Sequence, residues 1–377
     1  MIKMTVKKRI APRLSSHWVL GISVTFFLLI GTELFLRVSH LEQKVPAQPK
    51  GWAIIPERSW IEYHPVLGWV HQKNKQAVLQ KNGQEVPLTT NSLGLRGRRE
   101  YSPSRSKGIR RIYALGDSLT FGFGVRDEDT FPAQMEKADA SYEAMNFGVP
   151  GYGVDQIFLL LHTFGFAYQP DVVVITLYPE DFWRATRAFN DGGYGKPYFV
   201  LDSQGPLALR HVPVPPGKNF SVPQFPEVIH PSALEGLLEK SYLYRLARRA
   251  VTRLKKIMGR EDPDSSTEWI LGRAILKEMI GEIKSQRVRP VLVIAPPARW
   301  ITGTVEPVRD SLNLFAAREG VEILDLTPLF LNAVKKSSLD EYYIPNDQHW
   351  TAKGNALVAR SLLDYLRANP ERLYGEA

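Results

Sequence analysis

A serine lies at the end of an expected strand, where its hydroxyl could act as a nucleophile. Gly116, Asp117 and Ser118 follow the apolar run RIYAL, and the glycine-containing stretch LTFGFG comes next. Ligands of open parallel sheets bind outside the carboxyl ends of the strands, so this turn should face the crevice. A serine hydroxyl beside its own backbone N–H suits nucleophilic attack on an acyl group. An ordinary serine in a β-to-α turn is the alternative interpretation.

A histidine and an aspartate near the end of the sequence are the candidate base and its partner. The segment NDQHWTAKG places Asp347 two residues before His349, ahead of a helix that Thr351 should cap. A histidine can take the proton of a serine hydroxyl, and a carboxylate at Nδ1–H fixes its tautomer. We predict that His349 reaches Ser118 with Asp347 behind it, while Asn346 remains open as the alternative partner.

Two further strand ends could contact the substrate. The loop NFGVPGYG holds three glycines and a proline, so backbone N–H groups can approach a developing oxyanion, and Gly151 is the candidate donor. A simple tight turn is the alternative. After the run DVVVITL, Glu180 and Asp181 should reach the same crevice. An ionised Glu180 accepts hydrogen bonds but cannot donate one to an oxyanion.

Short apolar runs alternate with helical segments from Arg111 onward, which is typical of a parallel sheet flanked by helices. The predicted strands are RIYALGD, YEAMNFGV, DVVVITLY, PVLVIAPP and VEILDLT, and the predicted helices lie around 131–138, 154–168, 267–287, 306–319 and 351–368. We predict a three-layer α/β/α sandwich over residues 106–370, with an insertion or lid at about 182–266. Residues 41–105 should form a linker and a small β-extension with a hairpin at Asn82-Gly83.

The pattern of charged and apolar residues in 1–40 predicts a cytoplasmic basic tail and a transmembrane anchor. Five basic residues lie between positions 3 and 13, and the run 14–32 contains no Asp, Glu, Lys or Arg. About 20 such residues cross a bilayer as a helix, and the basic flank should stay in the cytoplasm. The rest of the chain would then lie on the periplasmic or extracytoplasmic side of the cell membrane. A cleaved signal peptide and a buried core helix are the alternatives.

Charge and cysteine content exclude several classes of function. The net charge is +9, but residues 1–44 hold seven Lys/Arg against two Glu, which leaves +4 for the remainder. The excess therefore gives no support for nucleic-acid binding. The chain has no cysteine, so disulfides, thiolate metal sites and cysteine nucleophiles are excluded.

The segments TTNSLGLRG, GDSLTFGFGV, NFGVPGYGVDQ and NDQHWTAKG together resemble the GDSL, or SGNH, hydrolase superfamily, and in particular its membrane-anchored bacterial members. The resemblance runs from about residue 94 to 366. It implies a flavodoxin-like fold, acyl-enzyme chemistry on Ser118, and neither metal nor organic cofactor. It assigns Gly151 as oxyanion donor and His349 with Asp347 as base and orienter. The family's third block reads G-x-N-D, so Glu180 replaces an asparagine that donates to the oxyanion.

Three functions fit these features. We expect an extracytoplasmic esterase or deacetylase that hydrolyses acyl esters, O-acetyl groups of envelope carbohydrate among them. An O-acyltransferase that modifies envelope polysaccharide with the same residues is one alternative. A non-catalytic sugar-binding relative is the other, and the replacement at Glu180 motivates it. The expected partners are an ester or acylated carbohydrate and, through the N-terminal helix, the membrane.

Overall fold

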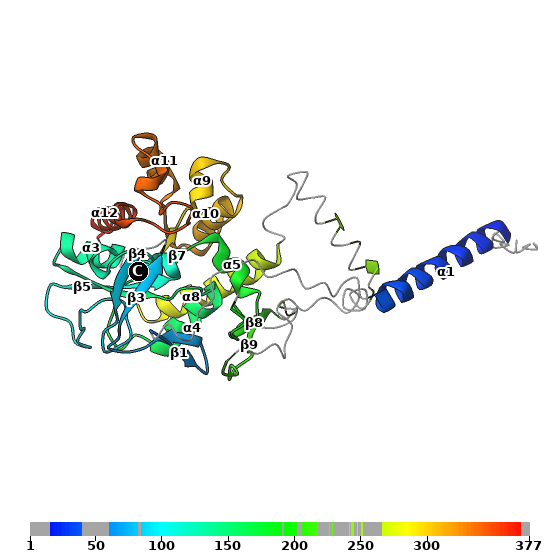
Figure 1. The fold of residues 1–377 in the computed structure, drawn as a ribbon, viewed down its shortest axis with the longest axis horizontal. Helices are drawn as coiled ribbons and strands as arrows, with labels where there is room; N and C mark the ends of the chain where they lie inside the picture. Colours follow the sequence, from blue (N-terminus) through cyan, green and yellow to red (C-terminus); the bar gives the residue numbers. More distant parts are fainter. Residues whose placement is uncertain are drawn as a thin grey trace, which may run out of the picture. The chain divides into compact units, whose positions relative to one another are not determined.

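The computed structural model describes residues 16–39, 60–81, 84–190, 192–201, 206–217 and 266–370, with scattered positions between 226 and 251. The chain divides into two compact units. One holds residues 1–48 and 231–261, and the other holds residues 49–230 and 262–377. The larger unit contains the sheet and all the residues predicted to do chemistry (Figure 1).

A five-stranded parallel sheet forms the centre of the larger unit. Its strands are β5 (Arg110–Gly116), β6 (Tyr142–Gly148), β7 (Val172–Leu177), β10 (Arg289–Ile294) and β11 (Glu322–Asp325). They lie in the order β11-β10-β7-β5-β6, which is the 2-1-3-4-5 order of flavodoxin-like sheets. Every residue of β7 and β10 is buried, as expected of strands covered on both faces. The prediction of a parallel sheet is confirmed.

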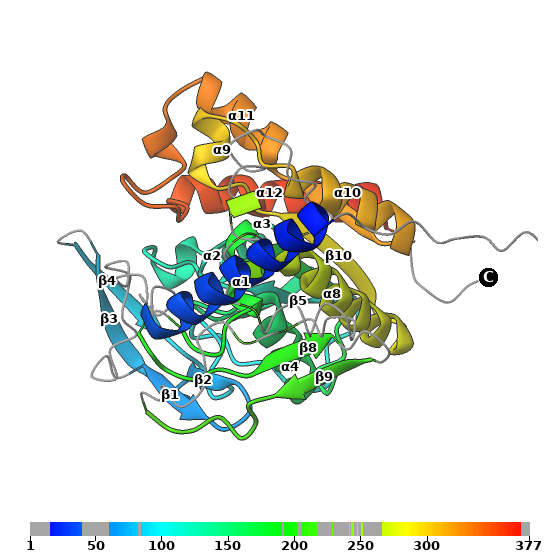
Figure 2. The same cartoon turned by 90° about the vertical axis from the view of Figure 1, so that its right-hand side faces the viewer.

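Helices cover both faces of this sheet (Figures 1 and 2). One apolar core joins it to α4 (Val154–Phe164), α8 (Thr267–Ser285) and α10 (Val308–Glu319). The opposite core joins it to α3 (Phe131–Ala138), α11 (Thr327–Lys335) and α12 (Ala352–Ala368). Adjacent residues of β5 alternate between the cores, with Tyr113 in the first and Ile112 in the second. The unit is therefore a three-layer sandwich, as predicted.

Short helices begin directly after three of the strands, at the edge where ligands of such sheets bind. They are α2 (Ser118–Phe121) after β5, α5 (Pro179–Ala185) after β7 and α9 (Ala298–Thr302) after β10. Two single turns of 3-10 helix, at Asp127–Asp129 and Leu339–Glu341, lie in later loops. These short elements carry or adjoin most of the predicted site residues.

The β-extension consists of two antiparallel pairs ahead of the sheet. β1 (Ile61–His64) pairs with β2 (Gly68–His71), and β3 (Gln76–Lys81) pairs with β4 (Gln84–Thr89). The predicted hairpin is confirmed, although its turn residues, 82 and 83, lie outside the described residues. Trp60, just before β1, stacks on Phe121 of α2 with ring centroids 5.2 Å apart. The extension thus packs against the helix that begins at Ser118.

The predicted insertion, residues 182–266, is described only in part. Its described portion includes the end of α5 and an antiparallel hairpin of β8 (Tyr198–Leu201) and β9 (Leu207–Arg210). Most of its remaining residues lie outside the described ones, so a lid remains a prediction.

The predicted membrane anchor overlaps helix α1 (Ser16–Ser39) of the smaller unit. Within the described part of the chain, no helix combines the length and the apolar character needed to cross a membrane. Glu33 of α1 accepts hydrogen bonds from the Ser241 hydroxyl at 2.8 Å and from the Leu243 N–H at 2.9 Å. The predicted tail and linker residues 1–15 and 40–59 lie outside the described residues.

Candidate active site

Ser118 begins α2 immediately after β5, and its surroundings fix the direction of its hydroxyl. The Asp117 carboxylate caps the helix by accepting from the Leu119 N–H at 2.9 Å. Gly148 of β6 lets α2 approach the sheet, because a Cβ there would lie 2.1 Å from the Phe121 nitrogen. The first N–H groups of a helix have no partner within it, so the Ser118 N–H is open to an acceptor. Hydroxyl and backbone donor are therefore presented together.

The structure brings Ser118, His349 and Asp347 together in one chain of hydrogen bonds. His349 Nε2 lies 2.8 Å from Ser118 Oγ, and His349 Nδ1 bonds Asp347 Oδ1. Asp347 Oδ1 also accepts from the His349 backbone N–H at 2.8 Å. The Asp347 side chain is 6% exposed and that of His349 is 19% exposed. The partner of His349 is thus Asp347 rather than Asn346, which adopts a left-handed backbone with φ of 57°.

Two residues that precede His349 in its loop hydrogen-bond to the segment that follows β10. Gln348 Oε1 accepts from the Ala298 N–H at 3.1 Å, and the Tyr343 hydroxyl donates to the Pro296 carbonyl at 2.8 Å. Trp350 is buried and stacks on Phe330 of α11. Thr351 caps α12 as predicted, through the Gly354 N–H. These contacts hold the imidazole in place before a substrate binds.

Gly151 lies in the loop after β6, next to the strand that leads to Ser118. Its φ of 82° is left-handed, and its N–H donates to no protein acceptor among the residues that the structure describes. Trp69 of the β-extension holds this loop, because its indole N–H donates to the Pro150 carbonyl at 3.1 Å and its own carbonyl accepts from the Tyr152 hydroxyl. The loop can therefore offer a fixed N–H to a substrate oxygen.

Glu180 is ion-paired and offers no hydrogen-bond donor. Its Oε1 atom accepts from Arg299 Nη1 at 2.7 Å, and the Nε of that arginine lies 2.8 Å from Glu306 Oε1. The Glu180 side chain is thus directed to α9. The backbone N–H groups of Ser118 and Gly151 stay the predicted oxyanion donors.

Asp181 belongs to a buried cluster that sequence reasoning missed. Its Oδ1 atom lies 2.7 Å from Arg184 Nη1, which also contacts Asp117 Oδ2 at 2.9 Å. Asp117 Oδ2 in turn lies 3.4 Å from Ser118 Oγ. Burial raises the pKa of Asp181 well above its usual range, and the charge of Asp117 adds to this. Burial alone would lower the pKa of Arg184, but the two carboxylates raise it overall.

Comparison with known proteins yields matches in structure alone. No family model matches the sequence, and no curated protein does. Matching solved structures include a member of the lipolytic protein G-D-S-L family from Veillonella parvula, with 10% identity over 69% of this chain and 99% of that one and a TM-score of 0.39. Another is the acetyl xylan esterase AlAXEase, with 16% identity over 68% of this chain and 99% of that one and a TM-score of 0.40. A third is the lipase/acylhydrolase from Enterococcus faecalis, with 14% identity over 69% of this chain and 96% of that one and a TM-score of 0.39. A likeness at this level does not decide the reaction.

Proposed function

We propose that this chain is a serine esterase of the GDSL/SGNH type that hydrolyses acyl esters through an acyl-enzyme on Ser118. The observation that carries the proposal is the connected set of Ser118 Oγ, His349 and Asp347, with 2.8 Å between the hydroxyl and the imidazole. A base within about 2.6–3.2 Å of the proton donor is what general-base activation of a serine requires.

The reaction follows from these contacts. His349 Nε2 takes the proton of Ser118 as Oγ bonds to the carbonyl carbon, and the Ser118 and Gly151 N–H groups stabilise the resulting oxyanion. The carbon–oxygen bond to the alcohol then breaks, and the leaving oxygen receives that proton from His349. A water molecule attacks the acyl-enzyme with His349 again as base, which releases the acid and restores Ser118. Asp347 keeps the imidazole in the required tautomer throughout.

The acyl group that fits best is small, such as acetyl. Ser118 is only 8% exposed, and the Phe123 ring packs beside the His349 ring at 5.0 Å, which favours a small acyl group. We further propose that the alcohol is a carbohydrate hydroxyl and that the catalytic unit acts outside the cytoplasm. The location is supported by the basic N-terminal residues ahead of the apolar run at 14–32.

Hydrolysis of an aryl acetate by the purified full-length chain tests the ester chemistry. Ser118→Ala should lower kcat by about 10⁶-fold, and Asp347→Asn by about 10⁴-fold because the tautomer is lost. Asn346→Ala is the matched control and should change kcat less than about threefold, since His349 does not use Asn346. Hydrolysis that persists unchanged in Ser118→Ala would exclude the proposal.

The paired state of Glu180 favours a second candidate, a sugar-binding protein without turnover. Loss of one oxyanion donor typically costs on the order of 3 kcal/mol of transition-state stabilisation. A fluorophosphonate probe separates the two functions, because it labels Ser118 only if the hydroxyl is activated. Absence of labelling together with retained sugar binding would favour the second candidate.

A further inference from the structure

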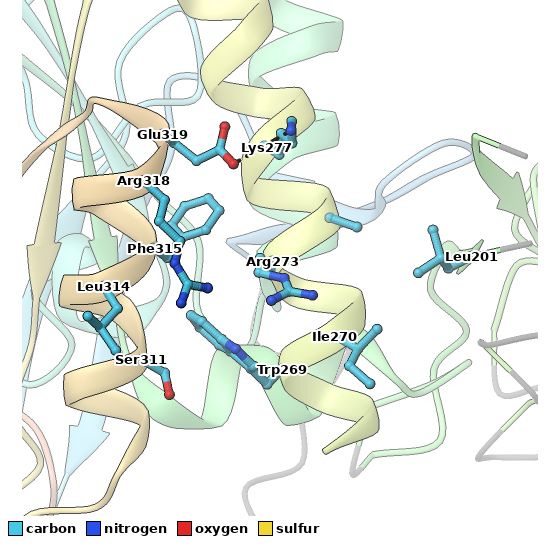
Figure 3. Close-up of a pocket in the computed structure, with 11 residues that line it drawn as sticks. Leu201, Trp269, Ile270, Arg273, Lys277, Ser311, Leu314, Phe315, Arg318 and Glu319 are labelled. Atoms are coloured by element: carbon cyan, nitrogen blue, oxygen red, sulfur yellow. Dashed lines mark ion pairs between the residues drawn. The ribbon is translucent and has the colours of Figure 1, made fainter. Parts of the chain in front are cut away.

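A basic groove lies between α8 and α10, on the outer side of one helical layer (Figure 3). Its volume is about 380 Å³. Trp269 and Phe315 form its floor and are both almost fully buried. The side chains of Arg273 on α8 and Arg318 on α10 also line the groove. All these residues belong to the larger unit.

Hydrogen-bond donors dominate the groove. The guanidinium groups of Arg273 and Arg318 face each other across it (Figure 3), and neither forms an ion pair with any carboxylate in the described part of the chain. The indole N–H of Trp269 is buried and has no acceptor among the same residues. The one acid of the groove, Glu319, lies 3.6 Å from the ammonium of Lys277. Two positive charges and an indole donor therefore remain without acceptors.

The hydrogen-bond donors that line the groove determine which class of ligand it can bind. A guanidinium is a planar fork of donors that matches the two oxygens of a carboxylate, and an indole N–H can only donate. The groove is larger than a single ion needs, and its rim includes apolar side chains, among them Leu314, which is 54% exposed, and Ile270. A carboxylate attached to a ring-sized body satisfies both the donors and the apolar rim.

The groove adjoins the helix that flanks the candidate active site. Trp269 packs on Phe182 of α5 with ring centroids 5.5 Å apart, and Gly272 allows this close approach. The same helix carries Arg184, which contacts Asp117 next to Ser118. Helix α5 thus contacts both the floor of the groove and the residue next to Ser118.

We propose that this groove binds the carboxylate of an acidic sugar unit, held between Arg273 and Arg318. Binding there requires no covalent step and does not depend on the esterase activity of Ser118. A glycan held at this point would place its other units near α5 and so raise their local concentration at the crevice.

Titration calorimetry with trigalacturonate on the full-length chain tests the proposal, with a neutral trisaccharide as the comparison ligand. Trigalacturonate should bind and the neutral sugar should not. Arg273→Ala and Arg318→Ala should each weaken binding about tenfold, as expected for a lost charge-assisted hydrogen bond. Arg360→Ala on α12, an exposed arginine in the opposite layer, is the matched control and should change affinity less than twofold. Repeating the titration with Ser118→Ala should give the same affinity, which separates this site from the ester chemistry.

Tryptophan fluorescence gives a second readout. Trigalacturonate should change the emission of the wild-type chain, and the change should disappear in Trp269→Phe while calorimetric binding persists in weakened form. Equal binding of the neutral sugar, or an Arg360→Ala effect as large as those of the groove variants, would overturn the proposal. Arginine-dependent binding of anionic phospholipid vesicles without binding of trigalacturonate would also overturn it, because the ligand would then be a lipid headgroup.

Discussion

Arg184 of α5 forms an ion pair with Asp117, the residue before Ser118. It offsets two carboxylates, Asp117 and Asp181, whose side chains are 1% and 0% exposed. A buried carboxylate without a partner is costly, and breaking a buried ion pair by removing one member usually costs about 3–5 kcal/mol. The position of Asp117, and through it the turn at Ser118, therefore depends on this guanidinium.

Arg184→Gln should lower the free energy of unfolding by about 3–5 kcal/mol at neutral pH. The loss should grow as pH rises. Burial already raises the folded-state pKa of Asp181, and removing the cation raises it further, so the folded variant binds a proton that the unfolded chain has released. Urea unfolding at pH 6 and pH 8.5 measures both effects. Asp181→Asn/Arg184→Gln should recover part of the stability, and a single variant within about 1 kcal/mol of wild type would contradict the account.

Residue types explain which site members the sequence could reveal. Ser118, Asp347 and His349 are chemically distinctive and follow strand ends or precede a helix, so their meeting was predictable. Arg184 was not, because an arginine four residues beyond Glu180 looks like an ordinary helix residue; its pairing with Asp181 at i,i+3 was the only local signal. The Arg299 partner of Glu180 lies 119 positions away and is set by tertiary structure.

At the scale of elements, the β-extension supports α2 through a buried aromatic cluster. His71 of β2 packs against both Trp60 and Phe121, with ring centroids 5.5 and 4.9 Å away. Burial lowers the pKa of His71 to about 4, and the nearby charge of Arg96 acts in the same direction. The imidazole is therefore neutral in the folded chain at neutral pH, and its Nδ1 contacts the Gly94 carbonyl.

His71 should make the fold sensitive to mild acid. Its unfolded pKa is about 6.5, so between pH 6.5 and 4 the unfolded chain binds a proton that the folded chain excludes. Stability contributed by neutral His71 is complete above this window and should fall by roughly 2 kcal/mol on going from pH 7.5 to pH 5. His71→Asn should remove that part of the pH dependence, measured by urea unfolding at the two pH values. His162→Asn, at an exposed histidine, is the control, and an identical pH loss in wild type and His71→Asn would refute the mechanism.

Element lengths explain which parts of the fold the sequence revealed. The five strands of the parallel sheet are continuous apolar runs, so their ends were predicted to within three residues, and long amphipathic helices such as α8 were found as well. Helices α2, α5 and α9 span only 4, 7 and 5 residues. One or two turns are too short to show a 3.6-residue period, and these helices form because the strand ends and their caps position them.

At the scale of the whole molecule, charge is distributed unevenly. Residues 1–44 carry +5 of the net +9, and the larger unit presents, in the groove between α8 and α10, two arginines that pair with no carboxylate of the described residues. A catalytic unit that binds acidic glycan would meet that ligand outside the cytoplasm. The proposed location outside the cytoplasm agrees with the basic N-terminal residues, because positive charge is biased toward the cytoplasm.

Thiol labelling can test the proposed location, because the chain contains no cysteine of its own. Lys335→Cys places one thiol at an exposed position at the end of α11. In intact spheroplasts a membrane-impermeant maleimide should label this variant to near completion, since the catalytic unit would face the medium. Lys3→Cys is the matched control, and it should react only after the membrane is permeabilised. Protection of Lys335→Cys until permeabilisation would place the catalytic unit in the cytoplasm and exclude envelope carbohydrate as its substrate.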